Sequence, residues 1–107
     1  SLKNTILLGF SQGAAMSIDA GIKLDFGLIV ACSGYLHPEW EPPKRIPRVL
    51  LSHGLKDEIV PIVRSREINQ KLIKIPNSKC ELIEFDGFHE INRNVVEAIQ
   101  SKIKLIF

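Results

Sequence analysis

Four short runs of apolar residues divide the chain, at residues 4–9, 26–32, 48–53 and 79–85. The second run is apolar without alternation, which is typical of a parallel strand covered on both faces. The fourth run is more polar, so we expect it to lie nearer an edge of the sheet. The pattern predicts four strands in a mainly parallel sheet.

Patterns typical of helices occupy residues 12–23, 61–75 and 92–105. Gly21 is expected to cap the first of these helices. Four prolines in residues 37–47 exclude a regular element there. Strand and helix patterns therefore alternate along the chain, which indicates an α/β fold with helices flanking the sheet.

Pro61 is expected at the first position of the second helix. Asn92 is expected to be the N-cap of the third helix. Helical spacing also predicts the apolar faces of these helices. They consist of Ile68, Leu72 and Ile75 in the second helix and Val96, Ile99, Ile103 and Ile106 in the third.

With 107 residues, 45% hydrophobic and 24% charged, the composition is that of an ordinary soluble globular domain. A net charge of +2 is too small to argue for a nucleic-acid partner or an anionic membrane surface. No apolar run has the length of a bilayer crossing and no signal peptide begins the sequence, so we expect no stable membrane insertion. The sequence opens with Ser1 rather than Met and enters a strand almost at once, so we expect a fragment of a longer protein.

Cys32 and Cys80 fall in the second and fourth apolar runs. A buried free thiol behaves as a small hydrophobe, and we expect this of both. One strand would separate them, which puts them roughly 9–10 Å apart, and a disulfide requires Cα atoms within about 7 Å. Two reduced cysteines fit the cytoplasm.

The most informative motif is Gly9-Phe10-Ser11-Gln12-Gly13, between the first predicted strand and the first predicted helix. In this setting a Gly-x-Ser-x-Gly pentapeptide presents its serine at the tip of a sharp, strained turn. The glycines leave room for strand and helix to approach, and the Gln12 N–H points at a developing oxyanion. Gly and Ser are also ordinary loop residues, so the motif takes its meaning from this setting. It makes Ser11 the candidate nucleophile.

Two further polar residues follow predicted strands, at the carboxyl ends where the site of such a sheet lies. Asp57 follows the third strand and His89 the fourth, which gives the chain order of α/β-hydrolases. The histidine would take the serine proton, and the aspartate would fix the imidazole tautomer. Taken singly, each residue also suits a loop. Asp86 and Glu90 are rival acids, but both lie too close to His89 in sequence to reach its Nδ1 easily.

The pair His53-Gly54 also follows a predicted strand. Such a pair can mark the oxyanion loop of an esterase, but that loop lies upstream of the nucleophile, and this pair lies downstream of Ser11. We therefore expect it to shape the turn that presents Asp57. The cysteines and histidines lack metal-ligand spacing, so we expect no metal site. The sequence also contains no glycine loop that could cradle a phosphate.

Three phrases, at residues 9–14, 52–61 and 87–91, resemble the carboxylesterase/phospholipase family, which includes the acyl-protein thioesterases. They cover nearly the whole chain in order. The resemblance implies an α/β-hydrolase fold, no cofactor, and hydrolysis of carboxylic esters or acyl thioesters through an acyl-serine intermediate. The site residues it implies are Ser11 as nucleophile, Asp57 as acid, His89 as base and the Gln12 N–H as an oxyanion donor.

The sequence departs from this family in two respects. Phe88 stands where relatives commonly carry a glycine, which would narrow the acyl pocket or reposition the loop. Family members are about twice as long, and the absent half would supply the first strands and the second oxyanion donor. We therefore expect residues 1–107 to be the C-terminal half of an α/β-hydrolase domain. A companion chain or a second copy would cover the open strand, and the chain alone would be inactive or nearly so.

The leading hypothesis is a serine esterase or thioesterase acting on small-molecule esters or acylated proteins. Leu36, Trp40 and Phe88 are candidates to line its acyl pocket, with packing of the proline-rich loop as the alternative for Trp40. An alternative from another class is a non-catalytic remnant that serves as a folding or interaction module. The undamaged set of three polar residues argues against long decay. A peptidase of the same fold is weaker still, because nothing in the sequence builds a peptide-selecting domain.

Overall fold

The computed structural model describes all 107 residues, and its centre is one four-stranded sheet. All neighbouring strands are parallel, and their order in the sheet is their order in the chain. The strands are β1 (Ile6–Phe10), β2 (Leu28–Cys32), β3 (Val49–Gly54) and β4 (Cys80–Phe85). The predicted number of strands and their parallel arrangement are confirmed.

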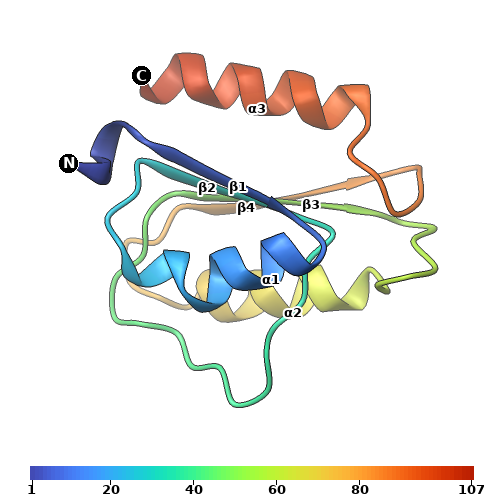
Figure 1. The fold of residues 1–107 in the computed structure, drawn as a ribbon, viewed down its shortest axis with the longest axis horizontal. Coiled ribbons are helices and arrows are strands. Elements are labelled where there is room, and N and C mark those ends of the chain that lie inside the picture. Colours follow the sequence, from blue (N-terminus) through green and yellow to red (C-terminus); the bar gives the residue numbers. More distant parts are fainter.

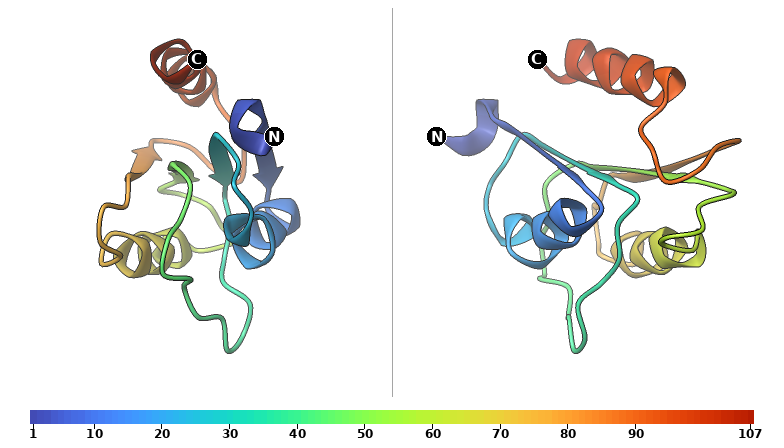
Figure 2. Two further views of the ribbon diagram at one scale, coloured as in Figure 1. Left: turned by 90° about the vertical axis from the view of Figure 1, so that its left-hand side faces the viewer. Right: turned by 45° about the vertical axis from the view of Figure 1, so that its right-hand side comes forward.

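Helices cover both faces of the sheet, which gives three layers (Figures 1 and 2). In Figure 1, α1 and α2 lie below the sheet and α3 lies above it. The helices are α1 (Gln12–Asp19), α2 (Val63–Leu72) and α3 (Arg93–Ile106), with short 3-10 turns η1 (Leu2–Asn4) and η2 (Gly21–Lys23). None of the helices combines the length and the apolar character that crossing a membrane requires.

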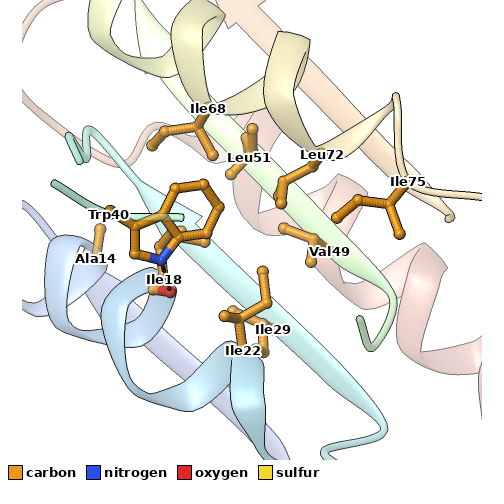
Figure 3. Packing of buried hydrophobic residues seen from close by; sticks show 11 residues of the cluster. Ala14, Ile18, Ile22, Ile29, Trp40, Val49, Leu51, Ile68, Leu72 and Ile75 are labelled. Carbon is orange, nitrogen blue, oxygen red and sulfur yellow. Dashed lines mark hydrogen bonds between the residues drawn. The ribbon is translucent and has the colours of Figure 1, made fainter. Parts of the chain in front are cut away.

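Two apolar clusters fill the spaces between the layers, and β2 contributes to both because its side chains alternate between faces. Ile29 and Ala31 join the cluster between the sheet and α1 and α2, which is drawn in Figure 3. Leu28, Val30 and Cys32 join the cluster that packs against α3. Every residue of β2 is buried, which agrees with its unbroken apolar run.

Two helix boundaries differ from the prediction. α1 ends at Asp19, and Gly21 begins η2 with a negative φ, so it is not a left-handed cap. Space explains this glycine, because a Cβ there would lie 2.4 Å from the Leu7 side chain. α2 begins at Val63 rather than at Pro61. The Pro61 carbonyl accepts a hydrogen bond of 2.9 Å from the Arg64 N–H, in the turn that leads into the helix.

The third helix has the expected N-cap but a slightly different buried face. The Asn92 side chain accepts a hydrogen bond from the Val95 N–H at 3.0 Å, as predicted. Val95 is fully buried, whereas Val96 is 43% exposed, so the prediction for Val96 is wrong. Since successive residues turn by about 100°, Val95 shares a face with Ile99, Ile103 and Ile106, and Val96 lies beside that face.

The two outer strands of the sheet are β1 and β4. The polar strand β4 lies at an edge, as predicted. β1 carries the exposed side chains of Leu8 and Phe10, and an apolar groove of about 370 Å³ runs between this strand and α1. Cys32 and Cys80 are both free, with β3 between their strands.

Candidate active site

Ser11 occupies the sharp turn between β1 and α1 in a strained conformation, with φ 57° and ψ −113°. Backbone outliers of this kind cost of the order of 1–3 kcal/mol and persist only where the surroundings hold them. Here the Ser11 N–H donates to the Cys32 carbonyl at 2.8 Å, and the Ser11 carbonyl accepts from the Ala15 N–H at 3.0 Å. The predicted strain at the serine is therefore present.

The two glycines of the motif differ in what they do. A Cβ at Gly9 would lie 2.3 Å from the Gly13 carbonyl oxygen and 2.7 Å from the Ala14 nitrogen, so only glycine lets β1 and α1 approach this closely. A Cβ at Gly13 would meet no atom within 4 Å. The prediction that both glycines leave room for this approach is thus correct for the position of Gly9 and wrong for that of Gly13.

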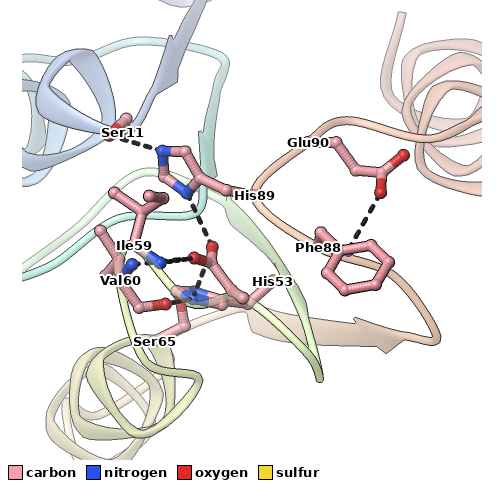
Figure 4. A network of polar contacts seen from close by, with 9 residues as sticks. Ser11, His53, Ile59, Val60, Ser65, Phe88, His89 and Glu90 are labelled. Atoms are coloured by element: carbon pink, nitrogen blue, oxygen red, sulfur yellow. Dashed lines mark hydrogen bonds and ion pairs between the residues drawn. The ribbon is translucent and has the colours of Figure 1, made fainter.

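The structure brings Ser11 and His89 together, although they are 78 positions apart along the chain (Figure 4). Asp57 lies at the other ring nitrogen of His89. Nε2 of His89 lies 3.0 Å from Oγ of Ser11, and Nδ1 of His89 lies 2.7 Å from Oδ2 of Asp57. The Phe10 ring packs on the imidazole with a centroid distance of 4.8 Å. The imidazole therefore bridges a hydroxyl and a carboxylate in the geometry of acyl-transfer sites.

The Asp57 carboxylate is fully buried and accepts hydrogen bonds on both oxygens. Its Oδ1 accepts the N–H groups of Ile59 at 2.9 Å and Val60 at 2.8 Å. Burial acts to raise the pKa of Asp57. The hydrogen bonds from His89, Val60 and Ile59, together with the charge of the imidazole, outweigh burial and hold the pKa below its ordinary value. The carboxylate is thus ionised at neutral pH.

The two rival acids have other partners. Asp86 forms an exposed ion pair with Lys56 at 2.9 Å. The Glu90 carboxylate accepts the Phe88 N–H at 3.0 Å. The carboxylate in contact with His89 is that of Asp57.

His53 reaches Asp57 with its own side chain, a contact that its expected role in shaping the turn did not include. Its side chain is fully buried, with Nδ1 at 2.6 Å from Oγ of Ser65 and Nε2 at 2.6 Å from the Val60 carbonyl oxygen. Nε2 also lies 3.3 Å from Oδ2 of Asp57. The available signal was a polar residue within an apolar strand, directly before a glycine.

Gly54 lets the loop that carries His89 cross close to the end of β3. A Cβ at this position would lie 2.2 Å from the Phe88 carbonyl oxygen and 2.5 Å from that of Gly87. The Gly54 carbonyl also accepts the Asp57 N–H at 3.2 Å. These contacts agree with the expectation that His53-Gly54 shapes the turn presenting Asp57.

The three candidates for the acyl pocket lie in different surroundings. Trp40 is buried in the cluster between the sheet and α1 and α2, where its indole N–H donates to the Ile18 carbonyl at 3.1 Å (Figure 3). Trp40 therefore packs the proline-rich loop against the core, which is the alternative to lining the acyl pocket. Leu36 lines an open groove of about 260 Å³, together with Ile59 of the Asp57 loop. Phe88 is 54% exposed beside His89.

The first turn of α1 provides one donor for a negatively charged oxygen. Gln12 is the first residue of this helix, directly after Ser11, so its N–H has no partner inside the helix. The positive end of the helix dipole lies at the same place. No group of three or more His, Cys, Asp or Glu side chains in the structure could hold a metal ion.

A serine on a sharp turn after one parallel strand, with an aspartate and a histidine after later strands, defines an α/β-hydrolase. The family model described as phospholipase/carboxylesterase matches residues 1–107. The chain belongs to this family, as the sequence motifs indicated.

Solved structures of esterases and thioesterases share the fold. Esterase PE8 is 31% identical, with a TM-score of 0.85 over 95% of this chain and 50% of its own. Arabidopsis thaliana SOBER1 is 22% identical, with a TM-score of 0.80 over 98% of this chain and 54% of its own. Zea mays acyl-protein thioesterase 2 is 18% identical, with a TM-score of 0.77 over 92% of this chain and 54% of its own. The chain thus spans about half the length of these structures, and no curated protein matches its sequence.

Proposed function

We propose that this chain carries the nucleophile, acid and base of a serine hydrolase that cleaves carboxylic esters or acyl thioesters. One observation carries the proposal: His89 lies 3.0 Å from the Ser11 hydroxyl through one ring nitrogen and 2.7 Å from Asp57 through the other. Serine is a weak nucleophile at neutral pH and requires such a base. The descriptions of the family and of its solved structures favour the same chemistry.

The reaction proceeds through an acyl-serine intermediate. Ser11 Oγ attacks the substrate carbonyl carbon and passes its proton to Nε2 of His89, while Asp57 stabilises the imidazolium. The negative oxygen of the tetrahedral intermediate accepts the N–H of Gln12. Collapse breaks the bond to the leaving alkoxide or thiolate, which takes the proton from His89. Water then attacks the acyl-serine with the help of the same base, which releases the carboxylic acid and restores Ser11.

We propose that a second oxyanion donor lies on polypeptide outside these 107 residues. The structures that resemble the chain are about twice its length, and β1 has a neighbour on one side only. We propose that strands of a companion polypeptide pair with β1 and bring this donor. Loss of one oxyanion donor costs about 10²–10³ in rate, so the chain alone is expected to hydrolyse p-nitrophenyl acetate slowly or not at all.

The acyl group is proposed to lie in the groove that Leu36 shares with Tyr35, Ile59 and Val60, next to the Asp57 loop. Phe88 is exposed beside His89 and would border the leaving group. The free thiols of Cys32 and Cys80 favour a cytoplasmic location.

Labelling with a fluorophosphonate tests the proposal, because the reagent reacts with an activated serine without full turnover. The 107-residue chain should be labelled at Ser11, as identified by mass spectrometry of the peptides. Ser11→Ala should abolish labelling, whereas Ser17→Ala, six residues further along in α1, should not change it. Labelling that is absent, or unchanged by Ser11→Ala, would refute the assignment of Ser11.

A non-catalytic interaction module is the second candidate. The exposed apolar groove along β1 and α1 favours it, because such a surface invites association. Reactivity with the fluorophosphonate separates the two candidates. A chain that binds a companion polypeptide at β1 but never reacts at Ser11 would be such a module.

A further inference from the structure

His53 makes three polar contacts inside the protein, all from a fully buried imidazole. Its Nδ1 lies 2.6 Å from Oγ of Ser65, which belongs to α2. Its Nε2 lies 2.6 Å from the Val60 carbonyl oxygen and 3.3 Å from Oδ2 of Asp57. These contacts join the end of β3, the Asp57 loop and α2 at one point (Figure 4).

The partners fix the protonation of the ring. A carbonyl oxygen only accepts hydrogen bonds, so Nε2 of His53 carries a hydrogen and donates it to Val60. In a neutral imidazole the other nitrogen is an acceptor, and the Ser65 hydroxyl can donate to it. This arrangement leaves no polar atom of either side chain without a partner.

The two carboxylates near His53 have other hydrogen-bond donors. Asp57 already has His89 and two backbone N–H groups as donors. Glu84 stands opposite His53 in the register of β3 and β4, and both of its oxygens accept from Arg66 at 2.7 Å. Neither carboxylate depends on a charged His53 for a partner.

We propose that His53 is a positioning residue for the reaction, and that it acts through Asp57. Its Nε2–H holds the Val60 carbonyl, which fixes the turn of residues 57–60. This turn aims the N–H groups of Ile59 and Val60 at Oδ1 of Asp57. The same Nε2–H lies at the side of Oδ2, the oxygen that receives His89. The inference rests on the proposed function, in which Asp57 fixes the tautomer of His89.

The test reads the tautomer of His89 directly and does not require turnover. Long-range ¹H–¹⁵N spectra of the ring nitrogens, recorded at alkaline pH on the 107-residue chain, report which nitrogen is protonated. We expect Nε2–H at His53 and Nδ1–H at His89. Protonation of Nδ1 at His53, or of both its nitrogens, would overturn the proposal.

Two substitutions separate the donor from the bulk of the ring. His53→Gln keeps an N–H near the position of Nε2 and should leave His89 as the Nδ1–H tautomer. His53→Leu fills the space without a donor and should shift His89 toward a mixture with Nε2–H. Equal spectra for the two variants would overturn the proposal, because they would assign no role to the donor.

Ser65→Ala keeps the test decisive if His53→Leu fails to fold. This change removes the hydrogen bond that holds the His53 ring at Nδ1, and so loosens the aim of Nε2–H, while the core volume stays nearly unchanged. It should therefore shift the His89 tautomer in the same direction by a smaller amount. An unchanged His89 in a folded Ser65→Ala chain contradicts the proposal. A His89 tautomer that depends on His53 in a chain unreactive toward the fluorophosphonate supports this inference and refutes the proposed function instead.

Discussion

Replacing Gly54 by alanine should displace His89, the proposed base, although the added methyl group contacts no side chain of the site. The added Cβ would lie 2.2 Å from the Phe88 carbonyl oxygen and 2.5 Å from that of Gly87. Both are backbone atoms, so no side chain can rotate out of the way. To reach an ordinary contact of 3.4 Å, the Phe88 carbonyl has to retreat by about 1.2 Å.

His89 follows Phe88 directly, so most of this displacement reaches the imidazole. Its contacts with Ser11 at 3.0 Å and Asp57 at 2.7 Å would lengthen beyond hydrogen-bonding distance. A misplacement of about 1 Å can cost about 10² in rate. Overpacking against the backbone costs about 1–3 kcal/mol of stability. Gly54→Ala should therefore lose both reactivity and stability.

The assay combines the rate of fluorophosphonate labelling at Ser11 with urea unfolding of the same samples. Gly13→Ala is the matched control for unfolding, since its added Cβ meets no atom within 4 Å. Because Gly13 lies inside α1, its replacement by alanine should raise the free energy of unfolding by up to about 1 kcal/mol. A Gly54→Ala chain that is labelled and unfolds like the unsubstituted chain would refute the reasoning.

Three further predictions follow from burial and charge. The pKa of Asp57 is lowered by folding, so its stabilisation is present above the ordinary value of 3.8 and is lost as the pH falls through the folded value. In urea unfolding across acidic pH, the free energy of unfolding should therefore fall less steeply with decreasing pH for Asp57→Asn than for the unsubstituted chain. Equal pH dependence of the two chains would contradict this. Leu8 is half exposed on the open edge of β1, so Leu8→Lys should reduce self-association in sedimentation without loss of stability. Burial, with a smaller effect of Glu81, raises the pKa of Cys80 to about 12, so iodoacetamide at about pH 8 should modify it only after unfolding; rapid modification of the folded chain would argue against this burial.

Much of the fold could be predicted because the local signals are strong. The unbroken apolar run of β2 corresponds to a strand buried on both faces, and the polar β4 lies at an edge. The contacts of His89 with Ser11 and with Asp57 were also predictable, because carboxyl ends of parallel strands meet at one side of a sheet.

Other features depend on tertiary contacts that spacing does not encode. Gly21 looked like a helix cap, but packing against Leu7 explains it. Val96 fits the helical repeat as well as Val95 does, and only the placement of α3 on the sheet decides which one is buried. The hydrogen bond between His53 and Ser65 joins a strand to a helix, so the local sequence around either residue does not predict it.

The position of His89 after β4 has a consequence for biosynthesis. Segments nearer the amino terminus leave the ribosome first and can fold first. Ser11 and Asp57 can therefore take their places while β4 and the following loop are still unmade, since His89 follows Ser11 by 78 positions. In the proposed function, the Ser11 hydroxyl has no base until His89 has been made. The hydroxyl would then become nucleophilic only once β4 has joined the sheet, so the order of synthesis would delay its reactivity.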